Sequence, residues 1–272
     1  MTNIAIVGNS VPLLVIPNRS SEQDKTYAEI LRQSGFNMVL SAKQGVIISD
    51  LYKYLEDEVI CTLPDYIIFN FGVVESMRRA RPRWLELFLL DNVWNNSIID
   101  MGYNSELKRA IKFIFRKLYL YLIEYPLFKL GISWRWLSPS DFEFIYKDII
   151  NLCFQMTSVK KIILLSINSI SVELEKRLPG SQASVIEYNK IQQKIAESHP
   201  DIIFIDTNNM DFSINSADGI HFSSKAHALI ADQIKRHLSK PRSHFGSWEG
   251  QVPGPIQTLY RKIKNKWTGT KK

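Results

Sequence analysis

A serine, an aspartate and a histidine stand near the two ends of this sequence in contexts that suit nucleophilic catalysis. Gly8-Asn9-Ser10 follows an apolar run directly, so a tight turn at the end of a strand would present the serine hydroxyl to a crevice. Asp218 precedes His221 by three residues, which lets its carboxylate fold back onto the imidazole and fix the tautomer. These residue types can perform acyl transfer, in which serine attacks, histidine moves the proton and aspartate orients the histidine.

Each motif also has a plainer interpretation. A Gly-x-Ser tripeptide after a strand is common in loops, and His221 alone would fit a surface or helix-capping histidine. The catalytic interpretation is favoured by position, because the loop Asp218–His221 follows an apolar strand and precedes the last helical pattern. The other histidines have no partner at useful spacing, and we predict structural or surface roles for His199, His227, His237 and His244.

Strand patterns and helical patterns alternate along the chain. Apolar runs predict strands at Asn3–Val7, Phe36–Leu40, Tyr66–Phe71, Lys161–Ile167 and Ile202–Ile205. Helical spacing predicts helices at Glu22–Ser34, Ile48–Glu58, Asp141–Met156, Ser184–Ser198 and Ser223–Leu238. Several strands are continuously apolar, as in strands that are covered on both faces, so we predict a parallel sheet between two helical layers. The carboxyl edge of such a sheet would carry the catalytic groups.

Several segments resemble the conserved blocks of the SGNH/GDSL hydrolase superfamily. Gly8–Val11 is similar to the first block, with asparagine where aspartate is usual, and Ser41–Leu51 is similar to the second. Asp218–Phe222 closely resembles the fifth block. The segments Val185–Ile191 and Ile202–Asn209 are similar to those that usually precede it. The resemblance extends along most of the chain except residues 84–140.

The resemblance implies a fold, a reaction and a set of residues. The fold would be an α/β, flavodoxin-like three-layer α/β/α sandwich with a central parallel sheet. Ser10, His221 and Asp218 would form the catalytic triad, and the backbone N–H groups of Ser10 and Gly45 would bind the oxyanion. The activity would be ester hydrolysis, often the deacetylation of carbohydrates or lipids, without a metal or another cofactor.

The third block departs from the family pattern. The family has Gly-x-Asn-Asp after a strand, with the asparagine donating to the oxyanion, whereas this chain has Gly72-Val73-Val74-Glu75. Losing one such donor typically costs about 2.7–4 kcal/mol of transition-state stabilisation. Substitute donors or substrate-binding groups could be Asn70, Asn168, or an arginine of the run Arg78–Arg83 such as Arg79, although four arginines so close also suit a solvated turn.

Two other functions stay open on the sequence alone. An O-acetyltransferase acting on a surface polysaccharide would share the triad, and family members with altered third blocks include such enzymes. A non-catalytic binding protein could have lost activity with the change at Val74.

Composition bounds the domain organisation. With 272 residues and 45% hydrophobic content, we predict one hydrolase-like domain at 1–240 and a basic tail at 241–272. An aromatic-rich helical insertion at about 84–140 would lie over the carboxyl edge of the sheet, and a helix within it would begin near Ser105. Ordinary core helices with solvated lysines, a cap, an oligomer contact and a membrane-surface face all fit this insertion.

The charge distribution speaks against nucleic acid as a partner. The net charge is +7, but the last twelve residues carry six basic groups, which leaves residues 1–260 at +1. This is a weak footprint for a nucleic-acid-binding domain. The tail fits either a disordered solubilising end or a peripheral contact with an anionic membrane.

The same features predict a cytoplasmic enzyme, peripheral at the inner membrane face if the tail binds lipid. We find no apolar window long enough to span a bilayer, and the apolar start fits a core strand better than a signal peptide. The two cysteines, Cys61 and Cys153, are too few for a disulfide framework and are predicted to be free and buried. No cysteine and histidine cluster has zinc-ligand spacing.

Overall fold

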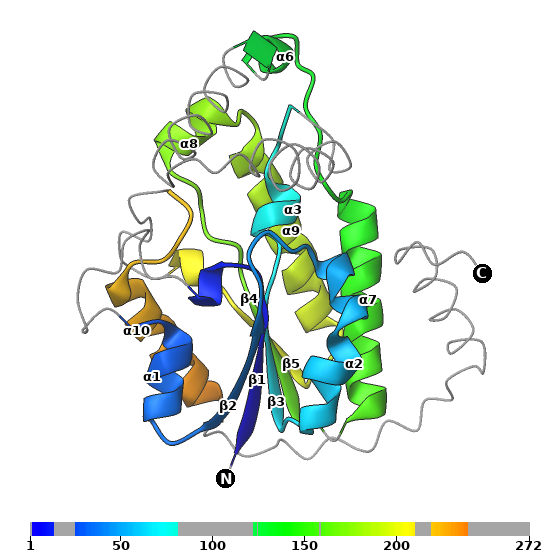
Figure 1. Ribbon diagram of the computed structural model, residues 1–272, viewed down its shortest axis with the longest axis vertical. Coiled ribbons are helices and arrows are strands. Elements are labelled where there is room, and N and C mark those ends of the chain that lie inside the picture. Colours follow the sequence, from blue (N-terminus) through cyan, green and yellow to red (C-terminus); the bar gives the residue numbers. More distant parts are fainter. Residues whose placement is uncertain are drawn as a thin grey trace, which may run out of the picture.

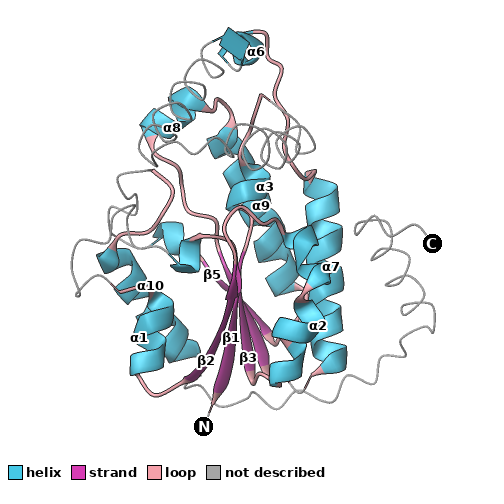
Figure 2. Ribbon diagram, viewed as in Figure 1, coloured by secondary structure: helices cyan, strands magenta, loops and turns pink. Residues whose placement is uncertain are grey.

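The computed structural model describes residues 2–13, 25–80, 122–123, 125–157, 159–209 and 219–238. Within these ranges a central sheet lies between two layers of helices (Figure 1). The strands form the middle layer and the loops at their carboxyl ends lead to further short helices (Figure 2). This is the predicted three-layer α/β/α architecture.

The sheet consists of five parallel strands: β1 (Asn3–Gly8), β2 (Asn37–Ala42), β3 (Tyr66–Asn70), β4 (Lys161–Leu165) and β5 (Ile202–Ile205). Their spatial order is β2-β1-β3-β4-β5, the flavodoxin-like order. All five predicted strands are present, with ends that differ by a residue or two. The strand order changes direction between β1 and β3, because β2 was added on one side of β1 and β3 on the other. In such sheets ligands bind outside the carboxyl ends of the strands at this point.

Helices cover both faces of the sheet. α1 (Tyr27–Gln33) and α10 (Ser224–Leu238) lie against one face, and α2 (Leu55–Glu58), α7 (Pro139–Met156) and α9 (Ser181–Glu197) lie against the other (Figure 1). Two further short helices, α3 (Val73–Ser76) and α8 (Val172–Arg177), follow the ends of β3 and β4. The sequence patterns did not predict these two, which lie beyond the carboxyl edge.

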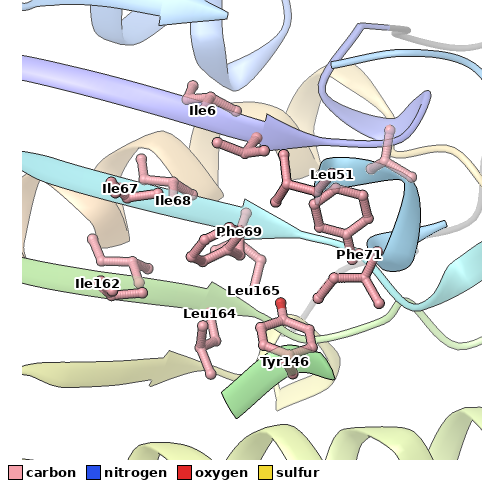
Figure 3. Close-up of a cluster of buried hydrophobic side chains, with 14 of the residues drawn as sticks. Ile6, Leu51, Ile67, Ile68, Phe69, Phe71, Tyr146, Ile162, Leu164 and Leu165 are labelled. Carbon is pink, nitrogen blue, oxygen red and sulfur yellow. The ribbon is translucent and has the colours of Figure 1, made fainter. Parts of the chain in front are cut away.

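The core is built from strands that are buried on both faces. Three consecutive side chains of β3, Ile67, Ile68 and Phe69, are fully buried, as the continuous apolar runs predict. Phe69 packs edge-on against Tyr146 of α7, with ring centroids 5.8 Å apart (Figure 3). Burial of each such side chain contributes about 1.5–3 kcal/mol, so β3 is the natural anchor for the loop that follows it.

Two predicted helices are shorter or broken. α1 begins at Tyr27 because Thr26 caps it: Thr26 Oγ1 accepts the Glu29 N–H at 3.2 Å, and Glu29 Oε2 accepts the Thr26 N–H at 2.8 Å. The segment predicted as one helix at 48–58 is a 3-10 helix, η2 (Ile48–Lys53), followed by α2. Tyr54 separates them, because its φ of −137° and ψ of 3° lie outside the helical region.

The predicted insertion is described only in its last part. A short helix, α6 (Tyr125–Lys129), lies far from the sheet (Figure 1). The chain returns where Trp134 pairs with Arg79 in an antiparallel bridge, and α7 begins at Pro139, so the insertion ends slightly before residue 140. The helix predicted to begin near Ser105 lies outside the described residues, as does the tail at 241–272.

Three smaller expectations have mixed outcomes. Cys153 is buried and free as predicted, whereas Cys61 is free but exposed, in the middle of the short helix η3 (Ile60–Thr62), of which Ile60 is the buried residue. His227 is fully buried and structural, since its Nδ1 accepts the Tyr27 N–H at 3.1 Å. None of the helices in the described ranges is long and apolar enough to cross a membrane.

Candidate active site

The turn that carries Ser10 lies at the carboxyl end of β1. Gly8 must be glycine here, because a Cβ would lie 2.6 Å from the carbonyl oxygen of Asn70 on β3. The fully buried Asn9 braces the turn, since its Oδ1 accepts the Val11 N–H at 3.1 Å. Asn9 therefore supplies the bracing acceptor that the usual aspartate would provide, and Ser10 is left half-buried at the sheet edge.

His221 meets Ser10 across 211 residues of sequence. Its Nε2 lies 2.9 Å from Ser10 Oγ, which is hydrogen-bonding distance. Both side chains are partly buried, so the pair is shielded from solvent only in part. The structure thus brings together the two residues predicted as nucleophile and base.

The loop of His221 is held on both sides. Asn168, just after β4, donates from Nδ2 to the carbonyl oxygen of Ile220 at 3.1 Å. Phe222 is buried and meets the His227 ring edge-on, with centroids 5.6 Å apart. These contacts fix the backbone on either side of the imidazole. Asp218 lies outside the described residues, so its orienting role stays a prediction.

Gly45, the predicted second oxyanion donor, lies in the turn after β2, the strand next to β1. Its φ is +71°, a left-handed conformation that favours glycine. A Cβ at this residue would have no other atom within 4 Å, so the preference for glycine comes from the backbone conformation and not from crowding. The start of this turn is tied to β1, because the Lys43 N–H donates to the Gly8 carbonyl at 3.1 Å. Ser10 and Gly45 thus follow adjacent strand ends, and their role as oxyanion donors stays a prediction.

The loop after β3 differs most from the family pattern. Gly72 has a φ of +114°, and a Cβ there would lie 2.3 Å from Ile167 Cδ1. It begins α3, in which Val74 is 8% exposed. An apolar, nearly buried side chain therefore occupies the position where the family has its amide donor.

The three candidate substitutes have different surroundings. The Asn70 amide is buried beside the Tyr27 hydroxyl, and neither group has a partner in good hydrogen-bond geometry among the described residues. Asn168 lies at the histidine loop, where its amide already donates to Ile220. Arg79 donates from Nη1 to the Val74 carbonyl at 2.7 Å, and its guanidinium lies 3.9 Å from the ring centre of Trp136. Among the described residues, Asn70 is thus the candidate whose amide contacts the Tyr27 hydroxyl without good hydrogen-bond geometry to any acceptor.

A buried acidic residue that the sequence interpretation did not single out is Glu75. It is fully buried, and its carboxylate accepts the Ile48 N–H at 2.7 Å and the Gly72 N–H at 3.0 Å. Burial raises the pKa of this carboxyl to about 7, against the lowering effect of its backbone donors and of Arg79. The signal was an acidic residue three positions after a glycine that follows a buried strand, which is the position of a helix-capping carboxylate.

A protein metal site needs several ligating side chains that converge on one point. In the parts of the chain that the structure describes, no group of three or more histidine, cysteine, aspartate or glutamate side chains could hold a metal ion.

Comparisons with known proteins identify the fold. No family model matches the chain, and no curated protein matches its sequence. The structure resembles a lipase/acylhydrolase from Enterococcus faecalis, at 16% identity and a TM-score of 0.55, over 89% of this chain and 100% of that one. It also resembles the acetylxylan esterase Axe2 from Geobacillus stearothermophilus, at 14% identity and a TM-score of 0.53, over 89% of this chain and 97% of that one.

A third similar structure is LAE5, an alpha/beta hydrolase enzyme from the metagenome of Lake Arreo, Spain. It is 14% identical with a TM-score of 0.51, over 86% of this chain and 94% of that one. At these identities the likeness concerns the fold, and it confirms the fold that the resemblance to SGNH/GDSL hydrolases implies.

Proposed function

We propose that the protein is a serine hydrolase that cleaves an ester, with an O-acetyl or O-acyl group on a carbohydrate or lipid as its substrate. The observation that carries this proposal is the 2.9 Å contact between Ser10 Oγ and His221 Nε2. A serine and a histidine in this geometry at the end of β1 form a nucleophile and its general base.

The reaction would proceed in two acyl-transfer steps. Ser10 Oγ attacks the ester carbonyl carbon while His221 Nε2 takes the hydroxyl proton, and the carbonyl oxygen becomes an oxyanion. The backbone N–H groups of Ser10 and Gly45 would bind that oxyanion. The intermediate collapses when His221 returns the proton to the leaving alcohol, and the acyl group stays on Ser10. Water then repeats the sequence, which releases the acid and restores the serine.

Asp218 would orient His221 and stabilise the imidazolium that forms in each step. This assignment rests on the Asp218–His221 spacing and on the resemblance of the segment to the fifth block. Under this assignment the turn of Ser10 and the segment Asp218–His221 would supply all three reacting groups.

A carbohydrate ester is the favoured substrate class. One protein of similar fold is an acetylxylan esterase, although another is a lipase/acylhydrolase. Trp134, which is 40% exposed, pairs with Arg79 in a backbone bridge, and the Trp136 ring centre lies 3.9 Å from the Arg79 guanidinium. Aromatic faces pack well against apolar faces of sugar rings, which supports a glycan over a long acyl chain.

An ester panel tests the proposal. Purified protein should hydrolyse 4-nitrophenyl acetate and acetylated sugars faster than long-chain lipid esters, and a fluorophosphonate should label Ser10 covalently. The control is Ser10→Ala, which should keep a native circular dichroism spectrum while losing both turnover and labelling. Turnover by Ser10→Ala near the wild-type rate would show that the nucleophile is assigned wrongly.

The same assay distinguishes a transferase from a hydrolase. Adding a glycan acceptor should leave the release of free acetate unchanged if water is the natural acceptor. A protein that is labelled by fluorophosphonate but transfers the acetyl group only to the glycan, without releasing free acetate, would instead be an O-acetyltransferase. Absence of labelling would point to a binding protein.

A further inference from the structure

Glu75 lies between two loops of the active-site edge and contacts both. One carboxylate oxygen accepts the N–H of Ile48, which follows the Gly45 turn, and the other accepts the N–H of Gly72 after β3. The side chain is fully buried, so water cannot replace these bonds without opening the core. A buried carboxylate with two backbone donors is a strong, directional link.

Hydrogen bonds hold the turn that carries Gly45 on both of its sides. At its start the Lys43 N–H donates to the Gly8 carbonyl, and at its end the Ile47 N–H donates to Asp50 and the Ile48 N–H to Glu75. Gly45 itself is exposed and has open space where a side chain would lie. The direction of its N–H therefore depends on these anchors, and Glu75 is the anchor that also binds the loop after β3.

The loop after β3 depends on the same carboxylate. Glu75 Oε2 holds the Gly72 N–H at 3.0 Å and so keeps the left-handed turn at the head of α3. Arg79 adds a second bond by donating to the Val74 carbonyl at 2.7 Å. The two side chains hold the segment in which this chain departs from the family pattern.

From these contacts we propose that Glu75 is a positioning residue, whose carboxylate ties the Gly45 turn to the loop after β3 and thereby aims the oxyanion donors. This inference rests on the proposed hydrolase function. A residue in this role makes no contact with the substrate, but its loss would misalign donors that must lie within about 3 Å of the oxyanion.

The link requires the ionised carboxylate, because a protonated oxygen would face an N–H donor with its own proton. Burial raises the pKa of Glu75 to about 7, so the link weakens as the pH falls below that value. Arg79 acts on Glu75, and Glu75 acts in turn on Tyr54, Tyr146 and Tyr188. Asp50 and Glu58 also act on Tyr54, and Arg135 and Glu187 also act on Tyr188. Burial raises the pKa of all three phenols, which therefore stay neutral near pH 7.

The test compares Glu75→Gln with Glu175→Gln. Glutamine keeps the shape but offers one acceptor instead of two, so kcat for 4-nitrophenyl acetate should fall about 10–100-fold with KM within about threefold. The ratio of wild-type to Glu75→Gln activity should grow as pH rises through about 7, because glutamine mimics the protonated acid. Glu175 of α8 is the matched control, because its carboxylate also accepts two backbone N–H groups, that of Gly180 at 2.7 Å and that of Gln182 at 2.8 Å. Its expected loss is below about threefold at every pH.

A second pair keeps the test decisive if Glu75→Gln does not fold. Ile48→Pro removes the N–H that Glu75 binds, at the first position of η2, where proline is tolerated. Ile48→Val removes one methyl group and keeps that N–H. Ile48→Pro should lose about tenfold or more in kcat and in fluorophosphonate labelling rate, whereas Ile48→Val should stay near wild type.

The inference is overturned if Glu75→Gln and Ile48→Pro both keep kcat within about threefold of wild type. Equal losses in Glu175→Gln or Ile48→Val would also overturn it, since general damage would then explain the effect. Either result leaves the proposed function standing as long as Ser10→Ala is inactive. If Ser10→Ala is active, the proposed function fails, and the inference about Glu75, which rests on it, fails as well.

Discussion

The ends of β1 and β3 lie side by side in the sheet but match the SGNH/GDSL pattern to different degrees. At β1, Asn9 braces the turn of Gly8-Asn9-Ser10, and Ser10 reaches His221 at 2.9 Å. At β3, an apolar Val74 stands where that pattern has an amide donor, and the loop is held by Glu75 and Arg79. Under the proposed function, Ser10 and His221 would carry out the proton chemistry in the usual way, while oxyanion binding would have to be supplied differently.

The contrast follows from what each site must do. A nucleophile and its base require one short contact between two side chains, which leaves little room for substitution. An oxyanion site requires several donors that converge on a point, and backbone N–H groups can provide them if their loops are rigid. Change is therefore easier to accommodate at β3, as long as the loops stay fixed.

The largest effect should come from removing His221, the proposed base for Ser10 at the end of β1. We expect His221→Ala to lower kcat/KM for an aryl acetate by about 10⁴–10⁶-fold while circular dichroism stays native, because this variant loses the ring nitrogen that lies 2.9 Å from Ser10 Oγ. Asp218→Asn should lose less, since other acceptors can partly orient the imidazole. Steady-state kinetics of both variants check this order, and a His221→Ala enzyme within tenfold of wild type would contradict the assignment.

The next effect separates the candidates for the missing donor. If the site lacks a third donor, Val74→Asn should raise turnover. If Asn70, Asn168 or Arg79 already supplies it, alanine at that residue should cost about 10²–10³ in kcat, and Val74→Asn should do nothing or lower the rate. Kinetics of the four variants decide between these outcomes. If none of the four variants changed kcat, neither explanation of the third oxyanion donor would hold.

Two of the glycines with a left-handed backbone, Gly72 and Gly45, give a smaller and purely structural contrast. Gly72→Ala places a Cβ 2.3 Å from the buried Ile167 side chain at a φ of +114°, so we expect a loss of roughly 2–5 kcal/mol in the free energy of unfolding. Gly45→Ala meets no atom within 4 Å and should cost only about 1–2 kcal/mol for its left-handed backbone. Urea unfolding of both variants measures the difference, and equal losses would show that the contact with Ile167 is relieved easily.

The fold could be predicted from the sequence because its signals are local. Continuous apolar runs such as that of β3 mark strands buried on both faces, and Thr26 with Glu29 marks the start of a helix once the cap is considered. The break at Tyr54 was missed, because a helical spacing of apolar residues continues across it.

The site was predictable only where the resemblance supplied the pairing. Ser10 and His221 are 211 positions apart, and no local pattern joins them. The role of Glu75 could not be predicted, because its partners Ile48 and Gly72 belong to loops after two different strands. Contacts of this kind depend on the order of strands in the sheet, which the chain's periodicity does not encode.

The smallest expected effect concerns the basic tail, which lies outside the described residues. Residues 261–272 carry six cations around Trp267, and each cation near an anionic bilayer contributes about 1 kcal/mol within a Debye length. The insertion also exposes apolar side chains such as Leu122, Tyr125 and Leu130. We therefore expect reversible binding to anionic vesicles, which would keep the enzyme near lipid-linked glycan esters without changing its chemistry.

Co-sedimentation with liposomes checks this expectation. Binding should require anionic lipid, weaken as salt rises and fall when residues 261–272 are deleted, while turnover of a small aryl acetate stays unchanged. Replacing the six tail cations with glutamine is the matched control for chain length, and it should behave like the deletion. Leu130→Gln tests the exposed apolar segment separately and should reduce binding less than the deletion does. Intact protein that stays in the supernatant with anionic vesicles at low salt would rule out the tail as a membrane contact.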